Sequence, residues 1–133
     1  MLPVAHRLRR PDQFRTVLRG RDGNQRLSGG RAGGDLMTVH AVRHPSASPE
    51  PSPPRVGFVV SKGVGNSVVR HRTQRRLRHL MLRRLPELAD RTDIVLRAHP
   101  SAANASSADL DHELDRLLTR VLDRMARGGG PHA

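Results

Sequence analysis

The spacing of apolar residues predicts three helices along this chain. The clearest comes last, because leucines and other apolar residues recur every three or four positions from 110 to 125, which is the spacing of one helical face. A short helix with the same spacing is expected over residues 11–20. A longer helical stretch runs from about 64 to 85, where Pro86 closes it. Each helix has one apolar stripe and therefore one face to bury.

Three short runs rich in β-branched and apolar residues predict strands. They are bounded by glycines, prolines and polar residues and cover residues 36–42, 55–61 and 93–98. The first two could form an antiparallel pair. A strand pair followed by a helix, a strand and a helix predicts an α+β or α/β sandwich in a single domain over residues 1–133.

Three segments are expected to be flexible. Residues 20–34 hold six glycines and little that could be buried, so they are predicted to form a loop. Residues 44–54 hold five prolines, which prevent both a helix and a strand ladder. The tail over 128–133 is short and Gly-rich. These segments are interpreted as the loops and the end of one domain.

Composition excludes several kinds of site. The chain has no Cys, so it has no disulfide, thiolate metal site or cysteine nucleophile. With two Phe and no Trp or Tyr, it lacks the residues for a broad aromatic stacking platform. Its longest apolar run is five residues, whereas a membrane span needs about 20, and no secretory signal is visible. We therefore expect a soluble, cytoplasmic protein.

The charge of the chain is strongly unbalanced. Lys and Arg number 24 against 12 Asp and Glu, a formal net charge of +12. A GC-rich genome would favour arginine over lysine, but it would not leave residues 55–84 with nine basic and no acidic residues. This local excess indicates a polyanionic partner.

The basic residues gather on one face of the expected helix over 64–85. At 100° per residue, its apolar side chains share one side, Arg70 and Arg76 lie at the margins, and the remaining cations and histidines lie opposite. That opposite set comprises His71, Arg72, Arg75, Arg78, His79 and Arg83. A solvated helix usually interleaves acids at this spacing, and this one has none. RNA or DNA contact is therefore favoured over a merely solvated face.

Gly63 and Gly65 come just before this helix. A glycine loop at a helix amino terminus brings backbone N–H groups close to a phosphate, but a tight strand-to-helix turn explains the same glycines equally well. The spacing matches neither the Walker nor the dinucleotide-binding pattern. Both interpretations stay open.

The residues around this helix resemble the signature of the bacterial ribonuclease P protein subunit. The matching stretch reads RVGFVVSK and then GVGNSVVRHRTQRRLR over residues 55–78. The likeness extends back to Arg7 and forward to the Leu-rich last helix, in the family's order. Three positions depart from it: Gly63 and Gln74 stand where the family usually has Lys, and His71 where it usually has Asn.

The resemblance implies a division of labour between protein and RNA. The RNA subunit, with Mg²⁺ ions, removes the 5′ leader of precursor tRNA, and the protein contributes no catalytic residue, metal or cofactor. One monomeric protein is expected to bind each catalytic RNA. The RNA contacts implied are Lys62, Asn66, Arg70, His71, Arg72, Arg75, Arg76 and Arg78.

The resemblance also implies a fold and a cleft for the leader. The fold is an α+β two-layer sandwich of roughly four strands and three helices, like the second domain of a small-subunit ribosomal protein. Its β-α-β crossover is left-handed, although nearly all such connections are right-handed. The cleft lies between the first helix and the sheet, with Phe14, and with Leu18 and Val39, as its wall. From the residues alone, Phe14 would be assigned to the core.

Other function classes explain less of the sequence. A small ribosomal protein or assembly factor, or a DNA-compacting protein, would share the basic charge but not the order of the motif over 55–78. A protein nuclease would need converging carboxylates, whereas Asp109, Asp111, Glu113 and Asp115 point in several directions around the start of the last helix. His112 and Glu113 lack the second His of a zinc site.

Overall fold

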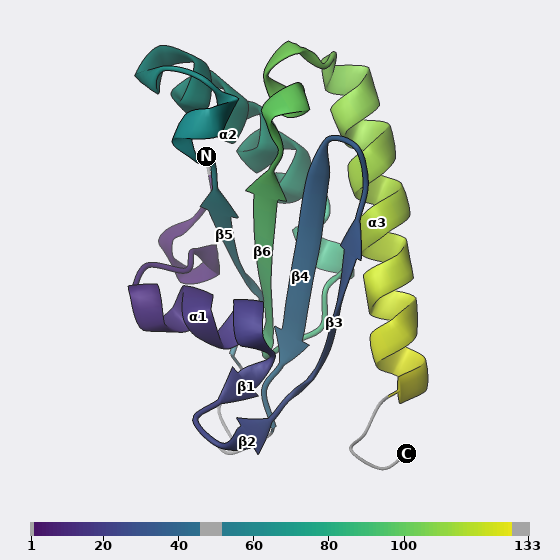
Figure 1. Ribbon diagram of the computed structural model, residues 1–133. Coiled ribbons are helices and arrows are strands. Elements are labelled where there is room, and N and C mark those ends of the chain that lie inside the picture. Colours follow the sequence, from purple (N-terminus) through teal and green to yellow (C-terminus); the bar gives the residue numbers. More distant parts are fainter. Residues whose placement is uncertain (1, 46–51, 129–133) are drawn as a thin grey trace.

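The computed structural model describes residues 2–45 and 52–128. A four-stranded sheet carries helices on both faces (Figure 1). Its strands lie in the order β3 (Ser28–Gly33), β4 (Met37–Arg43), β6 (Thr92–Ala98) and β5 (Arg55–Val59). A separate two-stranded hairpin consists of β1 (Arg21–Asp22) and β2 (Gln25–Arg26). The helices are α1 (Pro11–Arg19), α2 (Ser67–Leu82) and α3 (Ser107–Gly128).

The predicted helices are present, with one interruption. The stretch expected over 64–85 is divided into a 3₁₀ turn at Lys62–Val64, the helix α2, and a second 3₁₀ turn at Leu85–Glu87. No helix of the described residues is both long and apolar enough to cross a membrane.

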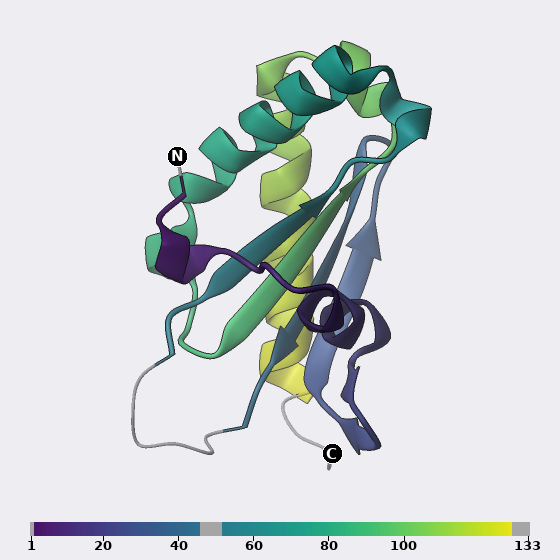
Figure 2. The ribbon, with the colours of Figure 1, turned by 90° about the vertical axis from the view of Figure 1, so that its left-hand side faces the viewer.

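Two separate cores lie on the two faces of the sheet. The larger core lies between one face of the sheet and the helices α2 and α3. It includes Val39 and Ile94 from the sheet, Leu77 from α2 and Leu117 from α3. The smaller core lies under α1 and comprises Leu8, Val17, Leu27, Val42 and Val95. Seen from the β5 edge, α1 and α2 lie on opposite sides of the sheet (Figure 2). Among the described residues, part of this second face beside α1 is accessible: Arg97 is exposed there and Thr38 is half-buried.

The predicted pairing of the first two strands was wrong. β4 does not pair with β5, because β6 lies between them, antiparallel to β4 and parallel to β5. Ile94, Val95 and Leu96 of β6 are completely buried. A central position in the sheet buries these side chains and gives β6 a hydrogen-bonded partner strand on each side.

The crossover from β5 through α2 to β6 is left-handed, as predicted. In the view of Figure 1, both strands run upward, β6 lies to the right of β5, and α2 passes behind the sheet. α1 lies in front. A right-handed connection would have placed α2 in front, beside α1. The left-handed connection instead places α2 and α3 together on one face.

The Gly-rich segment is not the loop predicted over 20–34. Most of it forms the β1–β2 hairpin and the edge strand β3, which pairs with β4 from Ser28↔Arg43 to Gly33↔Thr38. Strand pairing uses backbone groups and does not need large side chains. A Cβ at residue 29 would lie 2.4 Å from the carbonyl oxygen of Ala41, so glycine there permits the close approach of β4.

The other two segments predicted to be flexible lie largely outside the described residues. These are residues 46–51 of the Pro-rich segment and residues 129–133 of the tail. Their flexibility stays a prediction.

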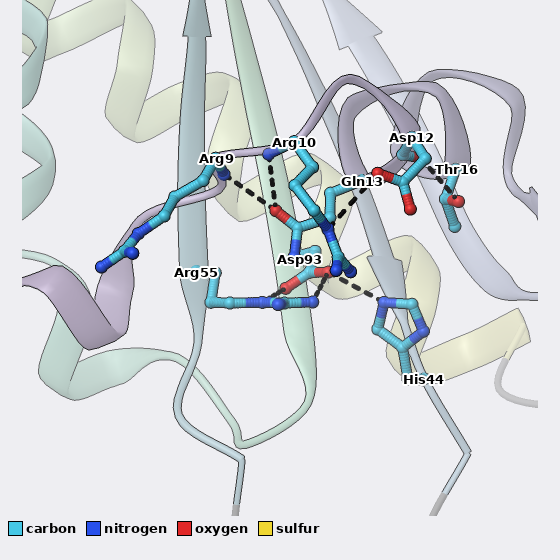
Figure 3. Close-up of polar contacts among 8 residues, drawn as sticks. All are labelled: Arg9, Arg10, Asp12, Gln13, Thr16, His44, Arg55 and Asp93. Atoms are coloured by element: carbon cyan, nitrogen blue, oxygen red, sulfur yellow. Dashed lines mark hydrogen bonds and ion pairs between the residues drawn. The ribbon is translucent and has the colours of Figure 1, made fainter.

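The two ends of the Pro-rich segment are held by one buried carboxylate (Figure 3). Asp93 in β6 accepts hydrogen bonds from Nε of Arg55 at 2.9 Å and Nη2 of Arg55 at 2.7 Å, and its Oδ2 lies 2.8 Å from Nε2 of His44. Burial by itself raises the pKa of Asp93, but the hydrogen bonds and charges of His44 and Arg55 together outweigh it and lower the pKa. Asp93 thus joins the end of β4 and the start of β5 to the central strand.

We expect Asp93→Asn to lower the free energy of unfolding by about 1–3 kcal/mol at neutral pH, because it removes charged hydrogen bonds in a buried position. Since the pKa of Asp93 is lowered in the folded state, its contribution is complete above the unfolded pKa near 3.9 and is lost as the pH falls through the folded pKa. The free energy of unfolding, measured with urea across a pH series, should therefore fall less steeply in the acid range for the variant than for wild type.

The matched control is Asp123→Asn, which breaks an exposed pair with Arg127. That change should cost less than about 1 kcal/mol. Equal losses in the two variants, or an unchanged acid limb for Asp93→Asn, would contradict the role assigned to Asp93.

Candidate nucleic-acid interface

The helix α2 buries one stripe and exposes its cations. Thr73, Leu77, Leu80 and Met81 are buried against the sheet and α3. His71, Arg72, Arg75 and His79 are exposed on the other side, as the spacing predicted. The packing of the apolar stripe therefore determines which way the arginines point.

Several arginines of α2 have free guanidinium groups within the described part of the chain. Arg72, Arg75 and Arg78 donate no hydrogen bond to another described residue and pair with no described carboxylate. A planar guanidinium binds a phosphate through two hydrogen bonds and stacks on a base. These side chains are available to a nucleic acid.

Other cations of α2 are held by the protein itself. Arg76 donates to the carbonyl of Ala105 and, at 3.3 Å, to Oγ of Ser107. At the end of the helix, Arg83 and Arg84 both contact Asp111 of α3. These contacts join α2 to the start of α3. Arg76 therefore helps to hold α2 against the start of α3.

The remaining predicted RNA contacts lie at the start of α2. Asn66 is its N-cap, and its Oδ1 accepts a hydrogen bond from the N–H of Val69 at 2.9 Å. Lys62 is exposed one turn earlier. Arg70 is half-buried, and its buried Nε has no hydrogen-bond partner among the described residues. All three lie close in sequence to the exposed arginines.

Gly65 has a structural reason to be glycine. Its φ is 154°, and a Cβ there would lie 2.8 Å from Cγ1 of Val69. A tight turn into α2 therefore requires glycine at this position. This favours the turn interpretation for Gly65.

A cavity of about 230 Å³ is lined by residues of both α1 and α2. Arg78 and Gln74 line it from α2, and Phe14 lines it from α1. The ring of Phe14 lies over Gly57 of β5, where a Cβ would approach the ring to 2.4 Å. Phe14 is half-buried, so one part of its ring packs on the small core and another part lines the cavity. We name this space the Phe14 cavity.

The other two residues predicted for the cleft lie elsewhere. Leu18 is half-buried on α1 and packs on the small core, but it lines a different hollow, at the far end of α1. The placement of Val39 was wrong, because this residue is completely buried in the large core, on the face opposite α1. Successive side chains of a strand point to opposite faces. A cleft residue of β4 must therefore be a neighbour of Val39.

That neighbour is His40, which the sequence pattern did not indicate and which lines the same hollow as Leu18. It lies on the α1 side of the sheet and is 6% exposed, and its Nε2 has no hydrogen-bond partner among the described residues. Burial lowers the pKa of His40, and the charges of Arg97 and Arg31 lower it further. His40 therefore stays neutral at physiological pH. The strand alternation, read together with the pairing of β4, would have identified it.

The carboxylates of α3 serve the fold. Glu113 is buried and accepts hydrogen bonds from the backbone N–H groups of Asp35, Leu36 and Met37 at 2.7–3.1 Å, which holds the turn between β3 and β4. Asp111 binds the arginines at the end of α2. Among residues 2–45 and 52–128, no three acidic or histidine side chains gather into a metal site.

Comparison with known proteins identifies the family. The family model described as ribonuclease P matches residues 2–122. The ribonuclease P protein component of a Nocardioides species is 46% identical over 122 residues, which are 91% of this chain and 95% of that protein. The corresponding protein of Streptomyces bikiniensis is 44% identical over 134 residues, 98% of each chain.

Solved structures agree with the fold. The ribonuclease P protein of Staphylococcus aureus matches with a TM-score of 0.69 at 18% identity, over 86% of this chain and 93% of that one. The protein from Thermotoga maritima matches with a TM-score of 0.66 at 19% identity, over 86% and 96%. At these identities the likeness shows the fold, and the sequence relatives show the family. The chain belongs to the ribonuclease P protein family.

Proposed function

We propose that this protein binds the catalytic RNA of ribonuclease P through the exposed face of α2 and the 5′ leader of precursor tRNA through the Phe14 cavity. The observation that carries the proposal is the position of Arg78. It belongs to the unpaired arginines of α2 and also lines the cavity that holds Phe14. One surface thus offers guanidinium groups for phosphates and an aromatic ring for a base.

The proposed benefit of the protein is electrostatic. Bringing precursor tRNA onto a catalytic RNA places two polyanions side by side, and divalent ions at high concentration would otherwise screen their repulsion. Arginines of α2 supply part of this screening. The protein is therefore expected to tighten precursor binding and to lower the Mg²⁺ requirement of RNA-catalysed leader removal, without supplying chemistry itself.

Carboxylates that could take part in hydrolysis make structural contacts in the described fold. Asp93, Asp111 and Glu113 hold loops and helix ends together. In this proposal the RNA subunit binds the catalytic Mg²⁺ ions, one protein monomer acts with each RNA in the cytoplasm, and the protein alone cleaves nothing. The alternative of a purely structural RNA-binding protein predicts no stimulation when the chain is mixed with ribonuclease P RNA and precursor tRNA at low Mg²⁺.

We expect Arg72→Ala and Arg75→Ala to weaken binding to ribonuclease P RNA for every substrate. Each lost phosphate contact should also reduce the slope of log K against log salt by about one unit. Binding measured by filter retention across a salt series checks this. Arg120→Ala on α3 removes the same charge from an exposed position and should change little. Variants of α2 that behave like this control would exclude α2 as the RNA site.

We expect Phe14→Ala to weaken the holoenzyme's binding of precursor tRNA roughly tenfold, the loss typical of removing one base–aromatic stack. Affinity for mature tRNA and single-turnover cleavage at saturation should stay nearly unchanged. Gly57→Ala should have the same effect, because its Cβ displaces the ring of Phe14.

The control for both variants is Val4→Ala, which shortens an exposed apolar side chain. Thermal melting of each variant separates lost binding from lost folding. If precursor and mature tRNA were weakened equally, Phe14 would be a core residue only.

A further inference from the structure

One row of arginines follows the side of α2 that contacts the start of α3. At about 100° per residue, Arg72, Arg76 and Arg83 lie within about 40° of one another, and the row is about 16 Å long. Arg83 comes directly after Leu82, the last residue of α2, and its φ of −71° and ψ of −17° continue the helical conformation. Of these three arginines, Arg72 alone has a guanidinium group without a partner among the described residues.

The start of α3 holds the other two arginines of the row. Arg76 donates to the carbonyl of Ala105 and to Oγ of Ser107. Nη2 of Arg83 donates to Oδ1 of Asp111 at 3.1 Å. The side chain of Arg83 is still 57% exposed. A carboxylate, and not burial, therefore removes Arg83 from the cationic face.

Asp111 also contacts Arg84, but this second arginine has other partners. Nη1 of Arg84 donates to the carbonyl of Leu80 at 2.9 Å, and its side chain is only 11% exposed. The hydrogen bond from Arg84, together with the charges of Arg84 and Arg83, lowers the pKa of Asp111, so this carboxylate is charged at neutral pH. If that charge were removed, Arg84 would stay in place and Arg83 would become free.

The carboxylates at this end of α2 come from another helix. Residues 55–84 contain no acidic residue, whereas α3 brings Asp111 to the end of α2 and has the exposed Asp109 and Asp115 on either side of it in sequence. A phosphate that approached Arg83 would be repelled by these charges. The surface that attracts phosphates therefore stops before the row of arginines does.

We propose that Asp111 is a specificity-determining residue, which pairs with Arg83 and so prevents RNA backbones from binding along the whole of the arginine row. This inference rests on the proposed function, because it assumes that RNA binds the exposed face of α2. Phosphate contacts carry no sequence information, so a longer row of free arginines would strengthen the binding of any RNA. Specificity is a difference between affinities, and a shortened row favours an RNA that makes further contacts elsewhere on the protein.

The test compares wild type and Asp111→Asn, as full-length chains, in binding to ribonuclease P RNA and to an RNA duplex of unrelated sequence across a salt series. Asparagine keeps an oxygen atom that accepts the hydrogen bond from Arg84. For the unrelated duplex, the variant should bind roughly threefold to tenfold more tightly at low salt. The slope of log K against log salt should steepen by about one unit, which is the contact of Arg83. Affinity for ribonuclease P RNA should change less.

Two further variants separate the release of Arg83 from a general gain of positive charge. Asp123→Asn makes the same charge change on α3, where Asp123 pairs only with the exposed Arg127 among the described residues, and should change neither affinity. In the Asp111→Asn background, Arg83→Ala should cancel the gain. Alone, Arg83→Ala should leave binding of both RNAs nearly unchanged, because Arg83 is already paired, whereas Arg75→Ala weakens binding.

Several results would overturn the inference. These are a gain no larger than that of Asp123→Asn, a gain that persists in Asp111→Asn/Arg83→Ala, and an equal gain for both RNAs. If Asp111→Asn melts far below wild type, the single variant Arg83→Ala decides, and a loss of binding as large as that of Arg75→Ala contradicts the pairing. A failure of the proposed function is distinguishable, because Arg72→Ala and Arg75→Ala would then bind like wild type.

Discussion

The placement of α2 and α3 on the same face of the sheet is the constraint on which the rest of this structure depends. Because the β5–α2–β6 crossover is left-handed, the two long helices share one core, and α1 covers part of the other face. Burying Leu77 and Leu80 in that core turns the arginines of α2 outward. The same arrangement leaves the α1 side of the sheet partly open, with a basic region at each edge.

The acidic residues explain why so much positive charge stays free. Asp93 joins the ends of the Pro-rich segment to β6, Glu113 holds the β3–β4 turn, and Asp111 binds the two arginines that follow α2. Carboxylates that are used inside the fold do not neutralise Arg72 or Arg75. An excess of cations destabilises an isolated protein through repulsion, and an RNA partner turns the same charges into binding energy.

Much of the fold and part of the site follow from local sequence. The helix α3 was predicted from leucine spacing, and the exposed set around Arg72 and Arg75 from the angle between successive residues. Val39 was placed on the wrong face. Successive side chains of a strand point to opposite faces, so an error of one position exchanges a core residue for a residue that faces the cleft. The pairing of β4 with β6, which decides that face, joins residues that are 49 to 61 positions apart, from Arg43↔Thr92 to Met37↔Ala98.

The sequence by itself determined the helices, the basic face of α2 and the family, because these depend on spacing within a few turns and on an ordered motif. Only the tertiary structure decided that a Gly-rich segment forms an edge strand, since strand pairing depends on a partner's backbone. It also decided that Arg124, in a region of net negative charge, meets Arg21 and Arg26. Charge counted along the chain gives local excess, whereas the field at a surface depends on which distant segments the packing brings together.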